Sequence, residues 1–430
     1  CPSCNEWNSF VEENIERIDS HGSALMKLHE SPLPITSIEA DETERLKIGI
    51  QEMDRVLGGG IVRGSAVLIG GDPGIGKSTL LLQILHKLAD KGHRVLYISG
   101  EESSKQIKLR GLRIGASSQH LFVLVEVSLE NILGQIAAIK PDVVVVDSVQ
   151  AVFSETLSSA PGSVSQVREA SEKLIILSKK SGIPLFLIGH VTKEGSIAGP
   201  RVLEHMVDTV LYFEGDSGHA FRIIRSVKNR YGPTNEIGVF EMSEGGLAEV
   251  SNPSALFLSE RPENSAGSIV VPSIEGTRPI LVEVQSLVAE TTFGIPRRTT
   301  IGVDHNRVSL LAAVLDKVCG FHFGNHDIFI NVAGGVKLVE PAVDLGIISS
   351  MVSSFLNRII ESKTVVCGEV GLTGEVRGIG QVESRIKEAF RMGFARCIIP
   401  NGVAFDNLSK SNIDVIRIKN IRELTDHLFE

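Results

Sequence analysis

The sequence predicts an α/β fold in two domains, and three observations carry that prediction. The chain has 430 residues, a length that suits two domains or one large one. Hydrophobic residues make up 42% and charged residues 22%, which is ordinary for a globular protein. Short β-branched runs alternate with helical patterns over much of the chain. This alternation is typical of a mainly parallel sheet covered by helices on both faces.

The composition also excludes several classes. No run of about 18 apolar residues occurs, so we expect no membrane span. The first residues, "CPSCNEWNSF", lack the basic and apolar regions of a signal peptide. Five cysteines in a chain this long do not make a disulfide framework, which favours a reducing, cytoplasmic setting. The net charge of −9 gives no global sign of nucleic-acid binding, but a ring or channel needs only a local basic lining.

Residues 1–19 predict part of a zinc finger. Cys1 and Cys4 form a C-x-x-C pair, whereas a tetrahedral zinc site needs four ligands and no second pair is near. The pair is either half of a Cys4 finger whose other half lies upstream, or a chance pair. A chain that begins on a cysteine favours the first interpretation. Residues 20–45 are polar and acidic, contain "SPLPIT", and predict a linker.

The first α/β domain is expected over residues 46–255. Its early strands and the helices between them predict a parallel sheet, and its later strands follow so closely that we expect antiparallel pairing at that edge. The early strands are at 65–71, 94–100, 142–148 and 184–191, the helices at 78–90 and 164–180, and the later strands at 209–214, 221–228 and 236–242.

A second α/β domain is expected over residues 256–430. The stretch 251–267 is rich in prolines and small polar residues, so we place the boundary there. The predicted strands lie near 268–274, 279–289 and 326–333, and the predicted helices near 307–319, 341–360 and 383–393.

The stretch "GGDPGIGKSTLLL" (70–82) contains the pattern G-x-x-x-x-G-K-S between an apolar strand and a helical run. Glycines let backbone N–H groups wrap phosphates, and the helix N-terminus adds a positive dipole. Lys77 is expected to reach the β- and γ-phosphates of ATP, and Ser78 to bind Mg²⁺. A glycine-rich turn that binds nothing is the alternative. The residues expected to hold ATP or ADP are Gly71, Asp72, Pro73, Gly74, Ile75, Gly76, Lys77, Ser78 and Thr79.

Carboxylates follow two of the predicted strands. Asp147 ends "VVVVD" at the sheet edge where open α/β folds bind ligands, so we expect it to hold Mg²⁺; capping of the next segment is the alternative. Glu101 and Glu102 close "RVLYIS" at the same edge. One of them could orient an attacking water, or both could form an acidic first helical turn. We assign catalysis to Glu101, since Glu102 is better placed to start the helix.

Two long loops and a strand end carry further candidates. His190 ends an apolar strand in "GHVTKEG" (189–195), where it would sense hydrolysis at the γ-phosphate; a structural histidine is the alternative. The loops 151–168 and 192–203 are long, and long irregular loops in a compact domain are usually functional. They suit a contact to single-stranded DNA, with plain surface loops as the alternative. Their cations are Arg168, Lys193 and Arg201.

The stretch "KNRYG" (228–232) follows a strand-like run and has two cations one residue apart. A solvated surface turn is the default interpretation. Because side chains alternate along a strand, Lys228 and Arg230 project to one face and could point at one anion together.

In this order, "GGDPGIGKSTLLLQ", "YISGEES", "VVVVDSVQ", "GHVTKEG" and "KNRYG" resemble the RadA (Sms) family of bacterial DNA-repair ATPases. The most specific parts are "LGGGIVRGSAVLIGGDPGIGKST" (57–79) and "KNRYG", although the usual family form of the latter has Phe in place of Tyr231. The start, "CPSCNEWNSFVEE", resembles the second half of the family's Cys4 zinc finger, so Zn²⁺ is implied at Cys1 and Cys4 in the full-length protein.

The resemblance implies a RecA-like P-loop ATPase core and hexameric rings similar to those of DnaB-type replicative helicases. Such rings use ATP to move on single-stranded DNA and promote branch migration on branched DNA in homologous recombination, together with RecA. The resemblance assigns Lys77, Ser78 and Thr79 to the Walker A motif and Asp147 to the Walker B motif. It also assigns Glu101 as the catalytic glutamate, and Lys228 and Arg230 as the pair contributed by a neighbouring subunit.

The second domain resembles the proteolytic domain of Lon protease. The stretch 368–394 parallels that family's segment around its catalytic lysine, and 339–347 parallels the segment of its catalytic serine. Here the serine position is Ala342, and the lysine position falls near Glu383, with Arg385 close by and no lysine before Lys387. A Ser–Lys dyad needs a hydroxyl and an amine that can lose its proton, so we expect an inactive domain.

We expect this second domain to assist ring assembly and to line a DNA channel. Ordinary surface cations are the alternative for each channel candidate. The candidates are Arg297, Arg298, Arg307, Lys337, Arg377 and Arg385.

The first hypothesis is thus an ATP-driven, ring-forming DNA motor for recombination and repair. One rival is an active Lon-like ATP-dependent protease, which would need Ser349 or Ser350 to pair with Lys387. Another is a nucleotide-gated scaffold for recombination proteins that hydrolyses ATP only incidentally.

Overall fold

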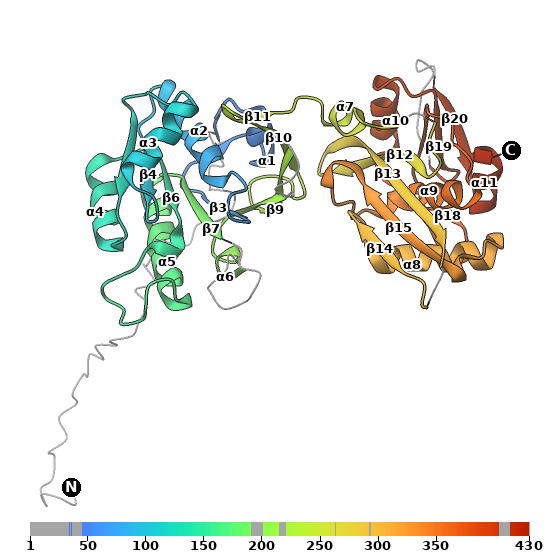
Figure 1. The fold of residues 1–430 in the computed structure, drawn as a ribbon. Helices are drawn as coiled ribbons and strands as arrows, with labels where there is room; N and C mark the ends of the chain where they lie inside the picture. Colours follow the sequence, from blue (N-terminus) through green and yellow to red (C-terminus); the bar gives the residue numbers. More distant parts are fainter. Residues whose placement is uncertain are drawn as a thin grey trace, which may run out of the picture. The chain divides into compact units, whose positions relative to one another are not determined.

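The computed structural model describes residues 45–190, 201–214, 221–262, 264–291, 294–403 and 413–429, together with Pro34 and Thr36. Cys1, Cys4, Lys193 and most of the predicted linker lie outside these residues. In the described part of the chain, no helix has the length and apolarity that crossing a membrane requires. Two large sheets, coloured blue to yellow-green and yellow to red in Figure 1, belong to the unit Thr43–Glu430.

The first sheet has nine strands in the order β11–β10–β9–β8–β3–β7–β6–β4–β5. Strands β3 to β8 run parallel, and β9, β10 and β11 pair antiparallel. The predicted change of direction is therefore present, but it begins at β9, since β8 is still parallel to β3. The strands are β3 (Ala66–Gly71), β4 (Val95–Ser99), β5 (Leu121–Val125), β6 (Val143–Asp147), β7 (Leu185–His190), β8 (Thr209–Glu214), β9 (Phe221–Asn229), β10 (Ile237–Ser243) and β11 (Gly246–Glu249).

Helices cover both faces of this sheet because successive strand side chains point to opposite faces. In β3, Val67 and Ile69 lie in a buried cluster with α1 and α2, while Ala66 and Leu68 lie in a cluster with α4 and α5. Between β4 and β6 the chain contains α3, the helix expected after Glu102, and also β5 and α4, which the sequence does not predict. The helices are α1 (Gln51–Val56), α2 (Lys77–Asp90), α3 (Ser104–Arg113), α4 (Leu129–Ile139), α5 (Val164–Ser181) and α6 (Arg201–Glu204). On either side of α1 in the chain, β1 (Arg45–Leu46) and β2 (Ile61–Val62) pair antiparallel as a separate two-stranded sheet.

The second sheet has seven strands in the order β14–β15–β13–β12–β16–β19–β20. One face packs against α8, α9 and α11, and the other against α10. The strands are β12 (Ser268–Glu275), β13 (Arg278–Glu290), β14 (Arg298–Ile301), β15 (His326–Val332), β16 (Thr364–Val366), β19 (Arg396–Pro400) and β20 (Asp414–Ile418), with a separate pair β17 (Glu369–Val370) and β18 (Val376–Arg377). The helices are α7 (Pro253–Leu258), α8 (His305–Val314), α9 (Asp344–Leu356), α10 (Val382–Arg391) and α11 (Ile421–Phe429).

Two sequence expectations change here. The predicted boundary segment 251–267 contains α7, whose first turn is capped by the side chain of Asn252. Helix α9 stops before the predicted end at 360, because Asn357 adopts a left-handed conformation with φ 50°.

The turn between β12 and β13 contacts the first sheet. Arg278 Nη1 lies 3.0 Å from Glu52 Oε1 of α1, and Glu275 pairs with Arg225 of β9. Burial raises the pKa of Glu275, and the charge of Arg225 opposes this shift. The division of the chain near residue 255 remains a prediction.

Candidate active site

The glycine-rich loop joins β3 to α2 in a shape that requires glycine. Gly71, Gly74 and Gly76 have φ values of 148°, 76° and 118°, which residues with a side chain rarely adopt. A Cβ on Gly76 would also lie 3.1 Å from the Cε atom of Met242. Gly76 is the N-cap of α2 and provides no side-chain cap. The backbone N–H groups at this helix end therefore face an anion site of the usual kind.

Lys77 is the first residue of α2 and is only 4% exposed. Its Nζ donates hydrogen bonds to the carbonyl oxygens of Gly71 (2.7 Å) and Asp72 (2.8 Å). Burial lowers the pKa of Lys77, and the charges of Asp147, Asp72 and Glu101 oppose this shift. The ammonium thus lies within electrostatic reach of the carboxylates at the ends of β4 and β6.

A cavity of about 400 Å³ opens between the glycine-rich loop, the ends of β4 and β6, and α3. It brings together all three predicted Walker A residues with Asp147 and Glu101. Its lining residues are Pro73, Gly74, Gly76, Lys77, Ser78, Thr79, Ser99, Glu101, Glu102, Arg110, Arg113 and Asp147.

The register of the parallel strands explains why the carboxylates meet. Strands β4 and β6 are neighbours, and Ser99 lies opposite Asp147. Asp147 is 7% exposed and accepts a hydrogen bond from the Tyr97 hydroxyl. Glu101 accepts a hydrogen bond from Ser148 Oγ. Both carboxylates are therefore held by hydroxyl groups at one edge of the sheet.

Glu102 does not start the following helix, and that expectation is wrong. Helix α3 begins at Ser104, and Ser103 is its N-cap in a reciprocal capping box with Gln106. The Glu102 carboxylate instead pairs with Arg110 of α3, and both residues line the cavity. Burial lowers the pKa of Arg110, but the hydrogen bond and charge of Glu102 outweigh it and leave the pKa raised. The assignment of catalysis to Glu101 stays a prediction.

The residues present fit a nucleotide with Mg²⁺. The glycine loop and uncapped α2 terminus suit phosphates, and the Ser78 hydroxyl and buried Asp147 carboxylate are oxygen ligands of the type that Mg²⁺ prefers. Zn²⁺ at Cys1 and Cys4 stays a prediction, because both cysteines lie outside the described residues.

The predicted loop 151–168 is more ordered than its sequence indicates. Gln166 is 1% exposed, and its amide contacts the backbone of Ser154, Leu157 and Ser159 at 2.8–3.2 Å. One buried side chain thus holds the whole segment before α5. The expectation of a structureless loop is therefore wrong.

The predicted DNA-binding and sensor residues are only partly described. Arg168 is exposed on α5, and His190 ends β7. Arg201 begins α6, and Lys193 lies outside the described residues. The side chains of His190 and Arg201 are not described, so these roles stay predictions.

Lys228 and Arg230 both reach the segment 204–208 of their own chain. Lys228 Nζ donates to the carbonyl oxygens of Glu204 (2.7 Å), Val207 (2.8 Å) and His205 (3.5 Å). Arg230 is 55% exposed and lies 3.5 Å from Asp208. Neither residue lines the nucleotide-sized cavity described above. Lys228 is therefore engaged within its own chain, whereas Arg230 faces solvent.

The other residues of "KNRYG" pack against the stretch 56–60. A Cβ on Gly232 would lie 2.7 Å from the Cα atom of Gly58, so the two backbones touch. Asn229 Nδ2 donates to Val56 O (3.4 Å), and Arg45 Nη2 donates to Tyr231 O (2.5 Å). The two stretches most specific to the resemblance therefore contact each other, a contact that sequence reasoning missed.

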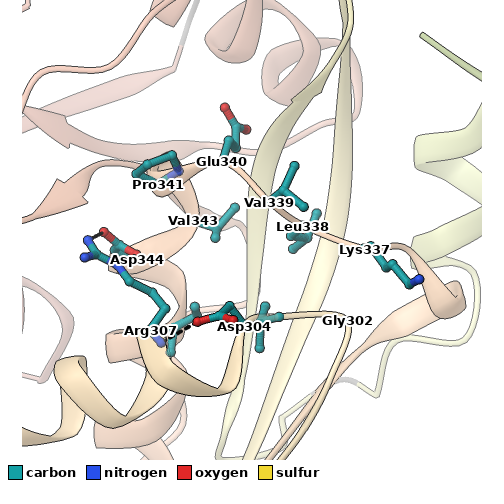
Figure 2. A pocket seen from close by; sticks show the side chains of 12 residues that line it. Gly302, Asp304, Arg307, Lys337, Leu338, Val339, Glu340, Pro341, Val343 and Asp344 are labelled. Atoms are coloured by element: carbon teal, nitrogen blue, oxygen red, sulfur yellow. Dashed lines mark hydrogen bonds and ion pairs between the residues drawn. The ribbon is translucent and has the colours of Figure 1, made fainter. Parts of the chain in front are cut away.

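A second cavity, of about 390 Å³, lies in the second domain and is lined on both sides of position 342 in the chain, by Pro341 and Val343 (Figure 2). Ala342 is 3% exposed, and two ion pairs flank it. Arg385 binds both carboxylate oxygens of Glu340, at 2.7 and 2.5 Å, and Arg307 pairs with the fully buried Asp344. Arg385, rather than the predicted Glu383, is thus the α10 residue that contacts this segment.

The structure offers no support for a serine protease at this place. Ser349 and Ser350 are buried, and their hydroxyls donate to the carbonyl oxygens of Leu345 (2.6 Å) and Ile347 (2.9 Å) within α9. Lys387 is 66% exposed and pairs with Glu383 at 2.5 Å. The three side chains that the protease rival requires have other partners.

Three of the predicted channel cations are buried or half-buried and have internal partners. Arg385 is 2% exposed, Arg307 binds Asp344, and Arg298 donates to the carbonyl oxygens of His326 and Phe323. A lining role for Arg385 is wrong, because its guanidinium is buried. The exposed candidates are Arg297, Lys337 and Arg377.

Comparison with known proteins places this chain beside curated DNA repair proteins. It is 55% identical over 428 residues to "DNA repair protein RadA" of Bacillus subtilis (strain 168), covering 98% of this chain and 93% of the relative. It is 52% identical over 430 residues to the protein of that name from Halalkalibacterium halodurans, with the same coverage.

Family models match two parts of the chain. The model described as "AAA domain" matches residues 31–196, and that described as "Subunit ChlI of Mg-chelatase" matches residues 284–402. Among solved structures, a KaiC-like protein of Pyrococcus horikoshii OT3 is 21% identical with a TM-score of 0.41, covering 48% of this chain and 99% of that chain.

Proposed function

The chain belongs to the RadA family of DNA repair proteins, and from this premise we propose that it is an ATP-driven, ring-forming motor on single-stranded DNA. In this role it promotes branch migration during homologous recombination. The observation that carries the proposal is the cavity in which Lys77, Ser78, Glu101 and Asp147 meet.

Each group in the cavity has a distinct task in ATP hydrolysis. The N–H groups at the start of α2 and the Lys77 ammonium would bind phosphate oxygens, and Ser78 and Asp147 would hold Mg²⁺. When bound, Mg²⁺ supplies a positive charge that stabilises the transferring phosphoryl group. Glu101 orients the attacking water and accepts its proton.

The arrangement of "KNRYG" supports a contribution from a neighbouring subunit. Arg230 is exposed, outside the cavity of its own chain, and its ion pair with Asp208 is long at 3.5 Å. A head-to-tail contact that closes into a hexameric ring would bring Arg230 to the γ-phosphate of the next subunit. Lys228 would first have to leave three carbonyl oxygens. We therefore assign the trans contact to Arg230 and the support of segment 204–208 to Lys228.

DNA binding is proposed for the predicted loops 151–168 and 192–203. Arg168, Lys193 and Arg201 would contact the backbone of single-stranded or branched DNA, and His190 would sense the γ-phosphate between them. RecA is the proposed recombination partner. Coupling of hydrolysis to movement then requires that DNA at these loops change the ATPase rate.

The test is the ATPase rate with and without single-stranded DNA, run beside mass measurement with and without nucleotide. We expect DNA to stimulate hydrolysis at low salt and nucleotide to favour a hexamer. No DNA binding and no stimulation would contradict the motor. A slow rate that DNA leaves unchanged, together with nucleotide-dependent binding of recombination proteins, would favour the scaffold.

A further inference from the structure

A buried tyrosine contacts the most important carboxylate of the cavity. Tyr97 lies on β4 with 0% exposure, inside the cluster packed by α1 and α2. Its hydroxyl donates a hydrogen bond to Oδ2 of Asp147. Tyr97 does not line the cavity itself. It therefore reaches Asp147 from within the core, behind the surface that a nucleotide would touch.

The strand register explains how this contact forms. On the neighbouring strands, Tyr97 lies opposite Val145, and Ser99 lies opposite Asp147. Tyr97 is thus two residues behind Asp147 along the sheet, on the same face. Two strand residues span about 6.6 Å, a distance that a tyrosine ring and its hydroxyl can bridge. Phenylalanine would fill the same space without supplying the donor.

The hydroxyl of Tyr97 is a neutral donor. Asp147 is 7% exposed, and a carboxylate so far from water needs hydrogen-bond partners. A tyrosine hydroxyl is an uncharged donor at neutral pH even in water. Tyr97 therefore stays protonated throughout the neutral range and adds no charge to the site.

We propose that Tyr97 is a positioning residue for the divalent cation that accompanies the nucleotide. By donating to Oδ2 it sets the rotation of the Asp147 carboxylate, which would hold the cation. The inference rests on the proposed function, because it requires that Asp147 serve a metal–nucleotide complex. It adds to that function a residue that acts through Asp147 and touches neither nucleotide nor metal.

The experiment is Tyr97→Phe in the full chain, with a fluorescent ATP analogue bound first in EDTA and then during a Mg²⁺ titration. The affinity in EDTA should stay within about twofold of the wild-type value. The Mg²⁺ concentration for half-maximal effect should rise about fivefold, a change of the size expected for the loss of one ordinary hydrogen bond. Mn²⁺ binding in the presence of ADP, followed by electron paramagnetic resonance, should weaken by a similar factor.

Tyr212→Phe is the matched control. It removes the same hydroxyl from another tyrosine–carboxylate pair, Tyr212 with Glu204 at 2.7 Å, on β8. We expect its Mg²⁺ titration to match that of the wild-type protein. If both variants shift alike, the effect of Tyr97→Phe is general and the proposal is overturned.

Other outcomes separate this inference from the proposed function. A wild-type Mg²⁺ response in Tyr97→Phe would overturn the inference and leave the ATPase proposal intact. If Tyr97→Phe lowers both the melting temperature and the affinity for the ATP analogue in EDTA, Tyr97 has only a structural role, and the inference is also overturned. If Mg²⁺ does not change the affinity of the wild-type protein for the ATP analogue, the proposed function itself is contradicted.

Discussion

The two sheets each carry a cavity, of about 400 Å³ in the first and about 390 Å³ in the second, yet their charged side chains are arranged differently. The first cavity has one ion pair in its wall, Glu102 with Arg110, but its Lys77 ammonium is bound by neutral carbonyl oxygens and its Asp147 carboxylate by a neutral tyrosine. In the second, Glu340 and Asp344 are bound by Arg385 and Arg307.

This difference separates a reactive site from a structural one. A buried charge held by neutral partners keeps its attraction for an ion that arrives later. A carboxylate paired with a guanidinium through two hydrogen bonds has little attraction left to offer. We therefore expect substitutions in the first cavity to change activity, and substitutions in the second to change stability.

The largest effect on activity is expected for Lys77→Ala. Loss of the buried ammonium should lower the hydrolysis rate at least about 1000-fold, since this charge stabilises the transferring phosphoryl group. Phosphate release measures the rate. Lys87→Ala, an exposed lysine on the same helix, is the control and should keep wild-type activity. If the Lys77→Ala protein hydrolyses ATP at the wild-type rate, the first cavity is not the reactive site that the comparison of the two cavities assumes.

The next largest effect is expected for Arg230→Ala. The hydrolysis rate should fall about 1000-fold if Arg230 acts as an arginine finger on the next subunit. Nucleotide binding should persist, and mixing with Lys77→Ala subunits should restore part of the activity, because each variant lacks a different half of the shared site.

Lys228→Ala is the comparison for that variant. It should mainly lower the free energy of unfolding, by about 1 kcal/mol, because carbonyl oxygens of segment 204–208 lose their donor. If an assembly made only of Arg230→Ala subunits has full activity, Lys228 and Arg230 belong to a surface turn with no catalytic role.

Glu101→Gln should lower the hydrolysis rate about 100-fold while nucleotide still binds, because a general base is removed without loss of shape. Glu102→Gln should have a smaller effect on the rate, since that carboxylate already pairs with Arg110. Single-turnover kinetics distinguishes the two. If Glu102→Gln is the more damaging change, the catalytic assignment moves to Glu102.

Arg385→Ala should destabilise the fold by about 3 kcal/mol, because the partly buried Glu340 would lose both hydrogen bonds from a guanidinium that is itself buried. Urea denaturation measures this, and the ATPase rate well below the melting temperature should be nearly unchanged. Arg377→Ala, which removes an exposed arginine paired with Glu375, should leave the free energy of unfolding nearly unchanged. If Arg385→Ala and Arg377→Ala lower the free energy of unfolding equally, the ion pairs beside the second cavity do not stabilise the fold.

The smallest effect is expected for Ala342→Ser, which should create no protease. A new hydroxyl would find no base, because an arginine keeps its proton and Lys387 is exposed and paired with Glu383. Casein incubated with this variant and ATP should remain intact. Casein cleavage by the Ala342→Ser variant, but not by the wild-type protein, would show that the second cavity can support proteolysis despite its ion pairs.

Local patterns carried much of the prediction. The strands β3, β4, β6 and β7 were found because continuous β-branched runs are typical of buried parallel strands. The P-loop was found because its glycines, lysine and serine lie within a few consecutive residues. By contrast, the prediction of an irregular loop over 151–168 is wrong. The backbone of this segment is held by hydrogen bonds to the buried side chain of Gln166, which the composition of the segment does not reveal.

Contiguous sequence was enough for the phosphate cradle, because the positive φ angles of its glycines and the start of α2 involve neighbouring residues only. The three-dimensional fold was needed for contacts between distant residues. It pairs Tyr97 with Asp147, Arg385 with Glu340, and Asn229 with Val56, across 50, 45 and 173 positions of the chain. These partners meet only after the strands are in register and the helices are packed. The physical reason is that a side chain's charge and donors are properties of its type, whereas the atoms that satisfy them depend on the fold.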